Sequence, residues 1–342
     1  SWRDPCVVWD PEIEKYRMYF CARSPENGPN PFPGRLGMAS SADLVHWTLE
    51  KPARTGNVSG VVECPDVFRF GEGWALLYYW HDTRIRFAGS LRDEWRRRNV
   101  LSPNHFDFMA AKQMWDGARH VLVGWIPRKK CDCSERVWGG ALACPRELYL
   151  DETGNAACRF IRELDDMLPA PVPEGSLSAS AFAYGAVERR GDDGFTLRDG
   201  FLHWGEVPGD YRLRFSMRPG SDYAVLTAFL RTNDGERPWA PPVSQGYQLI
   251  FDYPAGILRL REHYEWDQRI DIAAIPLTRS GKDATRVDIL LNGDVLEVNI
   301  NERETLVSRL AKYAGGGLGL HAADGGVDVS GWRMTGYAEG WP

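Results

Sequence analysis

Two short segments of the chain each place a carboxylate beside a proline: Arg3-Asp4-Pro5 near the start, and Glu63-Cys64-Pro65-Asp66 further on. A proline ring pushes the preceding residue out of the right-handed helical region toward extended or turn geometry, which stiffens both backbones. Breaking a glycosidic bond needs a carboxylic acid that protonates the departing oxygen and a carboxylate that stabilises a cationic sugar. Asp4 and Glu63 are candidates for this chemistry, with a plain turn as the alternative, because Asp-Pro is also common in turns.

The composition is that of a globular protein and narrows the choice of partners. The 342 residues are 43% hydrophobic and 26% charged, a length that suits two domains. No apolar run is long enough to span a bilayer. The net charge of −6 comes from interspersed charges of both signs, which argues against nucleic acid or an anionic membrane as the main partner. The 14 tryptophans suit either β-rich cores or the flat faces of sugars, and we expect most of them in the core.

The seven cysteines are odd in number and scattered, which favours reduced thiols over a disulfide framework. Cys131-Asp132-Cys133 is a closely spaced pair, but a structural zinc site needs four ligands, usually with a second such pair. We therefore expect no metal and no cofactor. The start of the chain shows no signal-peptide pattern, and Asn57-Val58-Ser59 fits a glycosylation sequon. The compartment stays open, with an extracellular or periplasmic location slightly favoured.

The chain reads as β almost throughout. Short segments rich in aromatic and β-branched residues alternate with Gly, Pro, Asn or Asp; examples are 16–21, 74–80, 85–88, 120–125, 211–217, 224–231, 247–251, 257–260, 286–291 and 295–300. Within the first 165 residues an acid-bearing strand, a hairpin and an outer strand recur, and Phe106-Asp107-Phe108 opens the third such unit. A propeller lines its central channel with the first strand of each blade, so Asp4, Glu63 and Asp107 would converge there.

The composition changes after residue 168. Three prolines and Ser- and Ala-rich sequence are followed by a polar stretch, which indicates a linker over 169–194. Beyond it, strands alternate apolar and polar residues, with Asn292-Gly293-Asp294 as a tight turn, as in an antiparallel sandwich. We therefore predict an all-β protein with a propeller-type domain at 1–168 and a β-sandwich domain at 195–342.

Five motifs, taken together and in order, resemble glycoside hydrolase family 32. They are Trp2-Arg3-Asp4-Pro5, the segment 41–47, Glu63-Cys64-Pro65-Asp66, the segment 106–112, and Trp138-Gly139-Gly140-Ala141-Leu142 with Pro145-Arg146-Glu147-Leu148. The segments 288–301 and 303–309 are similar to the ending of that family, so the resemblance covers essentially the whole chain. It implies a five-bladed propeller followed by a β-sandwich, and cleavage of β-fructofuranosides such as sucrose, inulin or levan with retention of configuration.

The resemblance also implies roles for single residues. Glu63 matches the general acid/base, which must hold its proton before donating it. Asp4 matches the transition-state stabiliser, and Arg3 would orient the sugar and the acid. Asp107 and Trp138 are further candidates for substrate binding, with a blade-core position as the alternative for Trp138.

One part of the family pattern is not found in the chain. The family's nucleophile is an aspartate in a Trp-Met-Asn-Asp-Pro-like segment upstream of the Arg-Asp-Pro motif, and this sequence has no such segment. We expect an incomplete propeller that lacks its first blade or more, in a chain that binds sugar but does not turn it over. Three explanations stay open. The first blade and its neighbour are missing from this sequence, they belong to another polypeptide, or the chain is a shortened relative that has lost hydrolysis.

An incomplete propeller exposes strand edges and apolar faces, so we predict a partner chain or self-association that covers them. Two other functions stay open. One is a catalytically incomplete carbohydrate-binding relative. The other is a furanosidase for another five-membered sugar, because Met109-Ala110-Ala111-Lys112 and Gly124-Trp125-Ile126-Pro127 are not typical of the best-known fructosidases.

Overall fold

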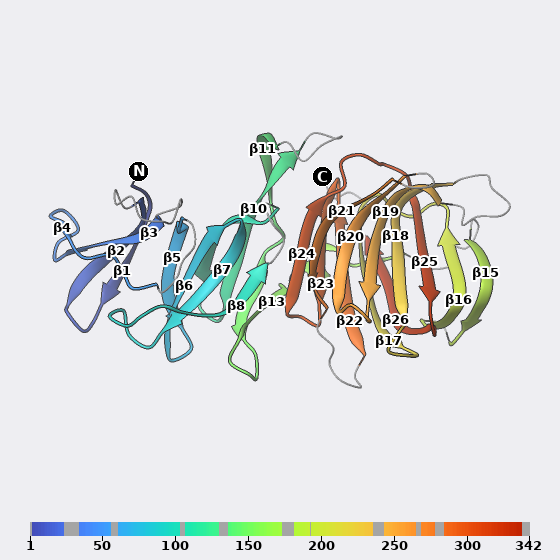
Figure 1. Cartoon of the computed structure of the whole chain (residues 1–342), viewed down its shortest axis with the longest axis horizontal. Helices are drawn as coiled ribbons and strands as arrows, with labels where there is room; N and C mark the ends of the chain where they lie inside the picture. Colours follow the sequence, from blue (N-terminus) through green and yellow to red (C-terminus); the bar gives the residue numbers. More distant parts are fainter. Residues whose placement is uncertain are drawn as a thin grey trace. The chain divides into compact units, whose positions relative to one another are not determined.

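The computed structural model of the chain is all-β (Figure 1). It describes residues 2–23, 34–55, 61–102, 107–129, 136–172, 181–191, 193–234, 243–264, 268–277 and 284–336. The chain divides into two compact units, the first formed by 1–127 and 140–158, the second by 128–139 and 159–342. Within the described ranges the one α-helix is α1 (Leu164–Met167), and no helix there is long and apolar enough to cross a membrane.

Three consecutive small sheets form the first unit, except that residues 128–129, 136–139 and 159–160 of the third sheet belong to the second unit. The first sheet has the order β1-β2-β3-β4 and the second β5-β6-β7-β8, while the third has the order β11-β10-β12-β13 with β9 also paired to β10. The strands are β1 (Arg3–Asp10), β2 (Lys15–Arg23), β3 (Gly34–Ser41), β4 (Thr48–Leu49), β5 (Glu63–Phe70), β6 (Gly73–Trp80), β7 (Asp82–Ala88), β8 (Arg96–Ser102), β9 (Met109–Trp115), β10 (His120–Lys129), β11 (Arg136–Leu142), β12 (Arg146–Leu150) and β13 (Ala156–Phe160).

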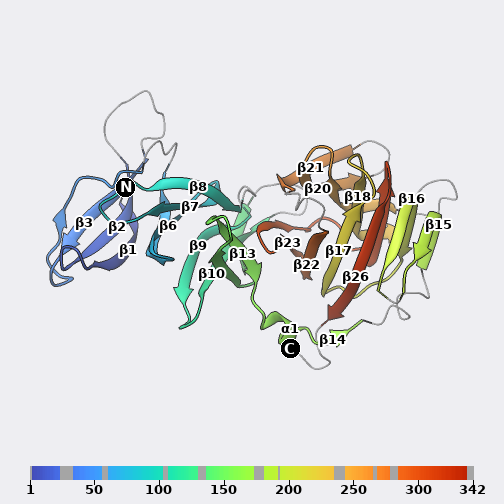
Figure 2. The ribbon, with the colours of Figure 1, turned by 90° about the horizontal axis from the view of Figure 1, so that it is seen from below.

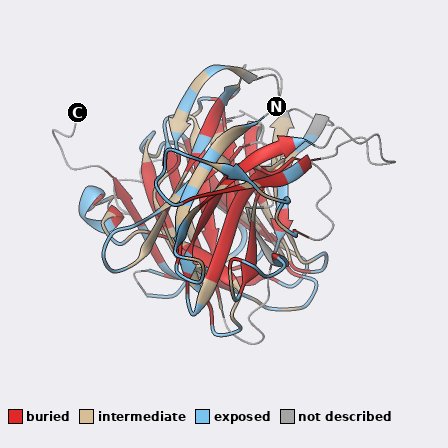
Figure 3. Ribbon diagram, turned by 90° about the vertical axis from the view of Figure 1, so that its left-hand side faces the viewer, coloured by how far each residue is buried: buried red, intermediate tan, exposed pale blue. Residues whose placement is uncertain are grey.

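The core of the first unit comes from the apolar central strands. Leu76 on β6, Tyr19 on β2 and Trp95 are fully buried in one cluster, where the Tyr19 and Trp95 rings meet edge to face at 6.1 Å. Figure 3 shows this distribution, with buried residues along the strands and exposed residues in the turns. Edge-to-face aromatic pairs contribute about 0.5–1.5 kcal/mol beyond the area that they bury. These contacts hold the first two sheets together and fix the strands that carry the candidate site.

The second unit is built on one 13-stranded sheet. Its main order is β21-β20-β19-β18-β25-β16-β26-β17-β22-β23-β24, with β14 paired to β26 and β15 paired to β16. The strands are β14 (Ala170–Pro171), β15 (Ala181–Arg189), β16 (Phe195–Trp204), β17 (Tyr211–Pro219), β18 (Val225–Asp234), β19 (Val243–Asp252), β20 (Ile257–Tyr264), β21 (Gln268–Pro276), β22 (Thr285–Asn292), β23 (Val295–Ile300), β24 (Glu304–Arg309), β25 (Gly317–Ala323) and β26 (Val327–Gly336).

The end strands β21 and β24 come back into contact, so the sheet curls into a nearly closed barrel (Figure 2). A continuous apolar core fills its interior, with Trp204 stacked on Trp332 at 5.2 Å and Phe195 and Phe215 against the same indole. The predicted turn at Asn292-Gly293-Asp294 is confirmed: β22 ends at Asn292, β23 begins at Val295, and Gly293 has a φ of 54°. Glycine adopts this left-handed conformation without steric cost.

The interval 169–194 differs from the predicted linker. It holds β14 and β15, which pair with β26 and β16 and so extend the large sheet. The Ser- and Ala-rich composition indicated a loop, but Ala181 to Tyr184 alternate small and aromatic residues, which suits a strand. The predicted boundaries at 168 and 195 stay predictions, while the compact units change over at residue 158. Cys131, Cys133 and the sequon at Asn57 lie outside the described residues.

Candidate active site

The first strands of the three small sheets share a backbone irregularity. The pairing register shifts between Arg3 and Cys6 on β1, between Glu63 and Asp66 on β5, and between Val123 and Trp125 opposite β9. A non-glycine residue lies in the left-handed region at each point: Asp4 (φ 58°), Cys64 (φ 48°) and Ala110 (φ 49°). Prolines follow Asp4 and Cys64 and disfavour the helical alternative. A β-bulge re-aims the side chains next to it, so the same device positions Asp4 and Glu63.

Arg3, Asp4 and Glu63 form one cluster. Arg3 donates from Nη2 to Glu63 Oε1 at 2.5 Å, and its Nε lies 3.5 Å from Asp4 Oδ2. The side chains of Arg3, Asp4 and Glu63 are 36%, 27% and 29% exposed. The guanidinium between the two acids reduces their mutual repulsion, which lets both carboxyl groups lie near one point. All three groups remain accessible to a ligand from solvent.

Cys64 contacts the same oxygen of Asp4 that lies near Arg3. Its backbone N–H donates to Asp4 Oδ2 at 3.1 Å, and its thiol lies 3.6 Å from the same oxygen. Burial, and after it the charge of Asp4, raises the pKa of the Cys64 thiol to about 11. The thiol is therefore protonated at neutral pH and donates to the carboxylate. This contact also connects β1 to β5.

A second set of contacts fixes β5 against its neighbours. Asp66 is 8% exposed and accepts hydrogen bonds from the Gln113 backbone N–H at 2.8 Å and from the Cys6 thiol at 3.7 Å. Lys112 donates from Nζ to the Pro65 carbonyl at 2.7 Å. Because these bonds join β1, β5 and β9, they hold the strands that carry Asp4 and Glu63 in a fixed relation.

The other two predicted substrate contacts lie in different environments. Asp107 is 1% exposed, beside Phe108, whose ring Arg146 covers at 4.3 Å. This burial argues against direct contact with substrate, and Asp107 is left out of the site proposed below. Trp138 on β11 is 97% exposed, so the alternative of a blade-core tryptophan is wrong. It belongs to the second compact unit rather than to the one that holds Asp4 and Glu63.

Sequence reasoning missed Cys64 and Lys112 as parts of the site. A signal for Cys64 was available, because Glu63-Cys64-Pro65 and Arg3-Asp4-Pro5 align on their prolines, with Cys64 and Asp4 in the same left-handed position. Lys112 gave no such signal, since its bond to Pro65 depends on two strands far apart in the sequence.

Residues 1–158 match the glycosyl hydrolases family 32 N-terminal domain. Over these residues the chain is similar to glycoside hydrolase family 32. A fructan 6-exohydrolase from Triticum aestivum is 25% identical over 225 residues, which cover 54% of this chain and 37% of that protein. A β-fructofuranosidase, an insoluble isoenzyme from Arabidopsis thaliana, is 24% identical over 218 residues, 52% of this chain and 36% of its own length. The matched region thus spans little more than a third of the length of these two relatives.

Solved structures of similar fold extend the likeness over nearly the whole chain. An exo-inulinase from Aspergillus awamori has a TM-score of 0.70 at 15% identity. The matched region covers 99% of this chain and 68% of the exo-inulinase chain. A sucrose-6-phosphate hydrolase from Lactobacillus gasseri has a TM-score of 0.69 at 12% identity, with coverages of 98% and 66%. At such low identity these likenesses show the fold, and they extend over both units of the chain.

Proposed function

We propose that this chain supplies the acid/base, Glu63, and the transition-state stabiliser, Asp4, of a site that cleaves β-fructofuranosides of the sucrose, inulin or levan type. The observation that carries this proposal is the cluster in which Arg3 bonds Glu63 and lies against Asp4, with the acids at bulges on two neighbouring strands. The match of residues 1–158 to the family 32 N-terminal domain supports it.

Each residue has a distinct part in the proposed reaction. Glu63 protonates the glycosidic oxygen as the bond breaks, and the fructosyl unit develops oxocarbenium character. The Asp4 carboxylate, fixed by Arg3 and Cys64, offsets this positive charge without reorganising, which is where preorganised groups have their largest effect. Retention also needs a nucleophilic carboxylate about 5–5.5 Å from the acid. In the family pattern this is the separate aspartate of the Trp-Met-Asn-Asp-Pro-like segment, so sugar binding and turnover are tested separately.

Binding is measured by thermal unfolding of the chain with increasing fructose or fructo-oligosaccharide. A ligand of the folded state stabilises it by about 2.7 kcal/mol at a concentration of 100 Kd, which raises Tm. We expect this rise in the wild type and a much smaller one in Asp4→Asn. The matched control is Asp43→Asn, in the turn between β3 and β4, where the side chain is 51% exposed. Equal shifts in the wild type and Asp4→Asn would contradict the proposal.

The two alternative functions give different results in the same assays. A carbohydrate-binding relative would show the sugar-induced rise in Tm while the wild type and Glu63→Gln release no fructose from sucrose, inulin or levan. A furanosidase for another five-membered sugar would cleave a synthetic furanoside in a substrate panel and leave all three fructosides intact.

Arg3→Met tests the proposed positioning role of Arg3. Methionine keeps much of the side-chain volume but removes the bond to Glu63 and the contact with Asp4. Misplacing groups by about 1 Å can cost about 10²-fold, so we expect fructoside turnover, or sugar affinity where turnover is absent, to fall about 10–100-fold. Arg23→Met, at the end of β2 in the same sheet, is the control. Unchanged kinetics and binding in Arg3→Met would remove Arg3 from the site.

We further propose that the three small sheets are blades of the family's propeller and that the large curled sheet forms its β-sandwich. The contacts of β1 with β5 and of β5 with β9 support the first part, because the first strands of propeller blades lie side by side at the centre.

A partner or a second copy of the chain is proposed to cover the face of β1. This strand is at the edge of its sheet, and Val7 and Trp9 on it are 42% and 46% exposed. Exposed apolar edges promote association. Sedimentation velocity of the purified chain is expected to show a dimer or larger species that Trp9→Ser weakens. A compact monomer at all concentrations, with no second chain bound, contradicts this prediction.

A further inference from the structure

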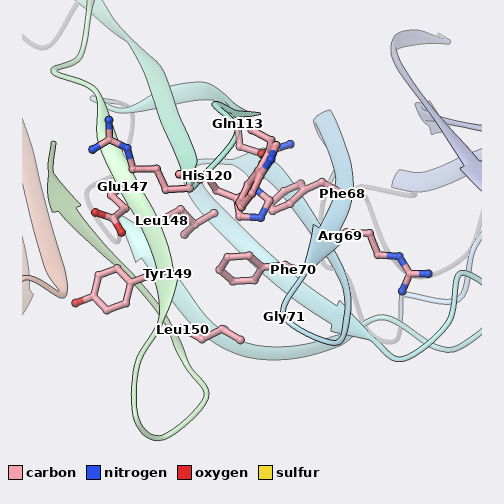
Figure 4. Close-up of a pocket in the computed structure, with 13 residues that line it drawn as sticks. Phe68, Arg69, Phe70, Gly71, Gln113, His120, Glu147, Leu148, Tyr149 and Leu150 are labelled. Atoms are coloured by element: carbon pink, nitrogen blue, oxygen red, sulfur yellow. The ribbon is translucent and has the colours of Figure 1, made fainter.

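A hollow in the first unit lies away from the Asp4 and Glu63 cluster. It has a volume of about 640 Å³ and is lined by residues of β5, β9, β10 and β12 (Figure 4). It is formed at the end of β5, around Phe68 and Phe70, whereas Glu63 begins that strand. At about 3.3 Å per residue, Phe68 and Phe70 lie about 16 and 23 Å along the strand from Glu63. A ligand here would not touch the proposed catalytic residues.

One wall and the rim of this hollow are apolar. Phe68 and Phe70 on β5 face Leu148 and Leu150 on β12 (Figure 4). Trp115, at the end of β9, lines the same hollow and is 57% exposed. An indole face left half in water gives a flat surface on which an apolar face of a ligand can stack.

A polar pair closes one end of the hollow. The His120 ring packs 5.2 Å from the rings of both Phe68 and Phe70 and 4.9 Å from that of Trp115. Its Nδ1 lies 2.7 Å from Gln113 Oε1. Burial lowers the pKa of His120, which keeps the ring neutral at neutral pH, although Asp116 raises it in part. A neutral imidazole that donates from Nδ1 has an acceptor at Nε2, and the Gln113 amide nitrogen is a donor.

The charged side chains around the hollow are paired or point away from it. This favours an uncharged ligand over an ionic one. Arg119 donates from Nε to Asp116 Oδ2 at 2.8 Å. Arg69 stacks over Trp74 at 4.4 Å and points away from the hollow (Figure 4). Glu147 and Tyr149 also line it, but their side chains lie on the side of β12 away from Phe70 (Figure 4). The remaining chemistry is an apolar face next to one hydrogen-bond acceptor and one donor. A neutral sugar carries both features, an apolar ring face and hydroxyl groups.

We propose that this hollow is a second carbohydrate-binding site, which holds one sugar unit of a neutral oligosaccharide with its ring against Trp115 and its hydroxyls on His120 and Gln113. The proposal goes beyond the function of the Asp4 and Glu63 cluster, since it would bind a chain without cleaving it. With two sites on one unit, the hollow could bind one part of a polymer while another part of it lies at the Asp4 and Glu63 cluster.

The test is isothermal titration calorimetry of the whole chain with a fructo-oligosaccharide mixture, in an Asp4→Asn background that weakens the first site. Binding that persists there is expected to weaken about 3–10-fold on adding Trp115→Ala, because an aromatic contact contributes about 0.5–1.5 kcal/mol. His120→Phe, which keeps the aromatic packing and removes the acceptor, should have a similar effect. Met114→Ala, at the preceding position on β9 and 59% exposed, is the control and should change nothing.

The outcomes separate this inference from the proposed function. If Asp4→Asn alone abolishes all binding, or if the remaining binding is unchanged by both Trp115→Ala and His120→Phe, the second site is overturned while the first stands. If Asp4→Asn binds as the wild type does and Trp115→Ala removes all binding, the hollow is the sugar site and the proposed function fails. Circular dichroism of each variant confirms that it is folded. If neither the wild type nor any variant gives a binding signal in the titration, both the second site and the proposed function are overturned.

Discussion

Where the nucleophilic aspartate is supplied and fructosides are turned over, replacing Glu63 with glutamine is expected to lower the rate of hydrolysis by about 10²–10⁴-fold, the usual contribution of a positioned general acid/base. Glutamine keeps the length and shape of the side chain and still accepts the hydrogen bond from Arg3 Nη2. It has no proton to give to the departing oxygen, so the loss should fall on kcat while sugar affinity changes little. The rate is measured as fructose released from sucrose, inulin and levan.

Glu72→Gln is the matched control for this variant. Glu72 lies in the turn between β5 and β6, on the hairpin that begins with Glu63, and is exposed. Its replacement makes the same chemical change outside the site and should leave the rate unchanged. A Glu63→Gln variant that hydrolyses fructosides as fast as the wild type would rule out Glu63 as the acid.

The second large effect concerns stability. Replacing Arg212 with alanine is expected to lower the free energy of unfolding of the second unit by about 3–5 kcal/mol, the usual result of removing one partner of a buried ion pair. Arg212 is buried with a side chain 6% exposed, donates to both oxygens of Asp288 at 2.9 and 2.7 Å, and reaches Asp165 at 3.0 Å. Its guanidinium also lies over the Phe160 ring at 6.0 Å. Alanine would leave the Asp288 carboxylate without this cation.

Urea unfolding measures this loss as a lower midpoint urea concentration. The transition of the second unit is followed by itself, because a chain of two units need not unfold in one step. Arg286→Ala is the control, because its guanidinium is 62% exposed and 3.9 Å from Glu302. Exposed pairs of this kind contribute about 0–1 kcal/mol. Equal midpoints for Arg212→Ala and Arg286→Ala would show that the buried pair does not stabilise the unit.

The strands could be predicted where the side-chain pattern alone decides the structure. Residues 296–300 alternate apolar and polar side chains next to a glycine turn, and the observed β23 has the predicted bounds Val295 to Ile300. The polar Glu297 and Asn299 are nevertheless buried, which the alternation does not predict. The predicted linker failed because the local pattern does not decide the structure there. Residues 181–189 are rich in small residues and become a strand because β16 offers them a partner, which no local pattern shows.

The candidate site could be predicted in part. The family motifs pointed to Asp4 and Glu63, and the structure brings them together through Arg3. The left-handed backbone at Asp4 and Cys64 could not be derived, because a non-glycine residue adopts it only where surrounding strands enforce a bulge. The burial of Asp107 could not be predicted either. The local sequence, an acid after an aromatic residue, does not show whether the acid is buried or exposed.

The most direct measurement is a crystal structure of the chain soaked with fructose or a short fructo-oligosaccharide. We expect a sugar at the Arg3, Asp4 and Glu63 cluster, with the Glu63 carboxyl near the anomeric centre and Asp4 accepting hydrogen bonds from ring hydroxyls. A sugar found only at the Trp115 hollow, or only in the second unit, with the cluster open to solvent and empty, would contradict the proposed function.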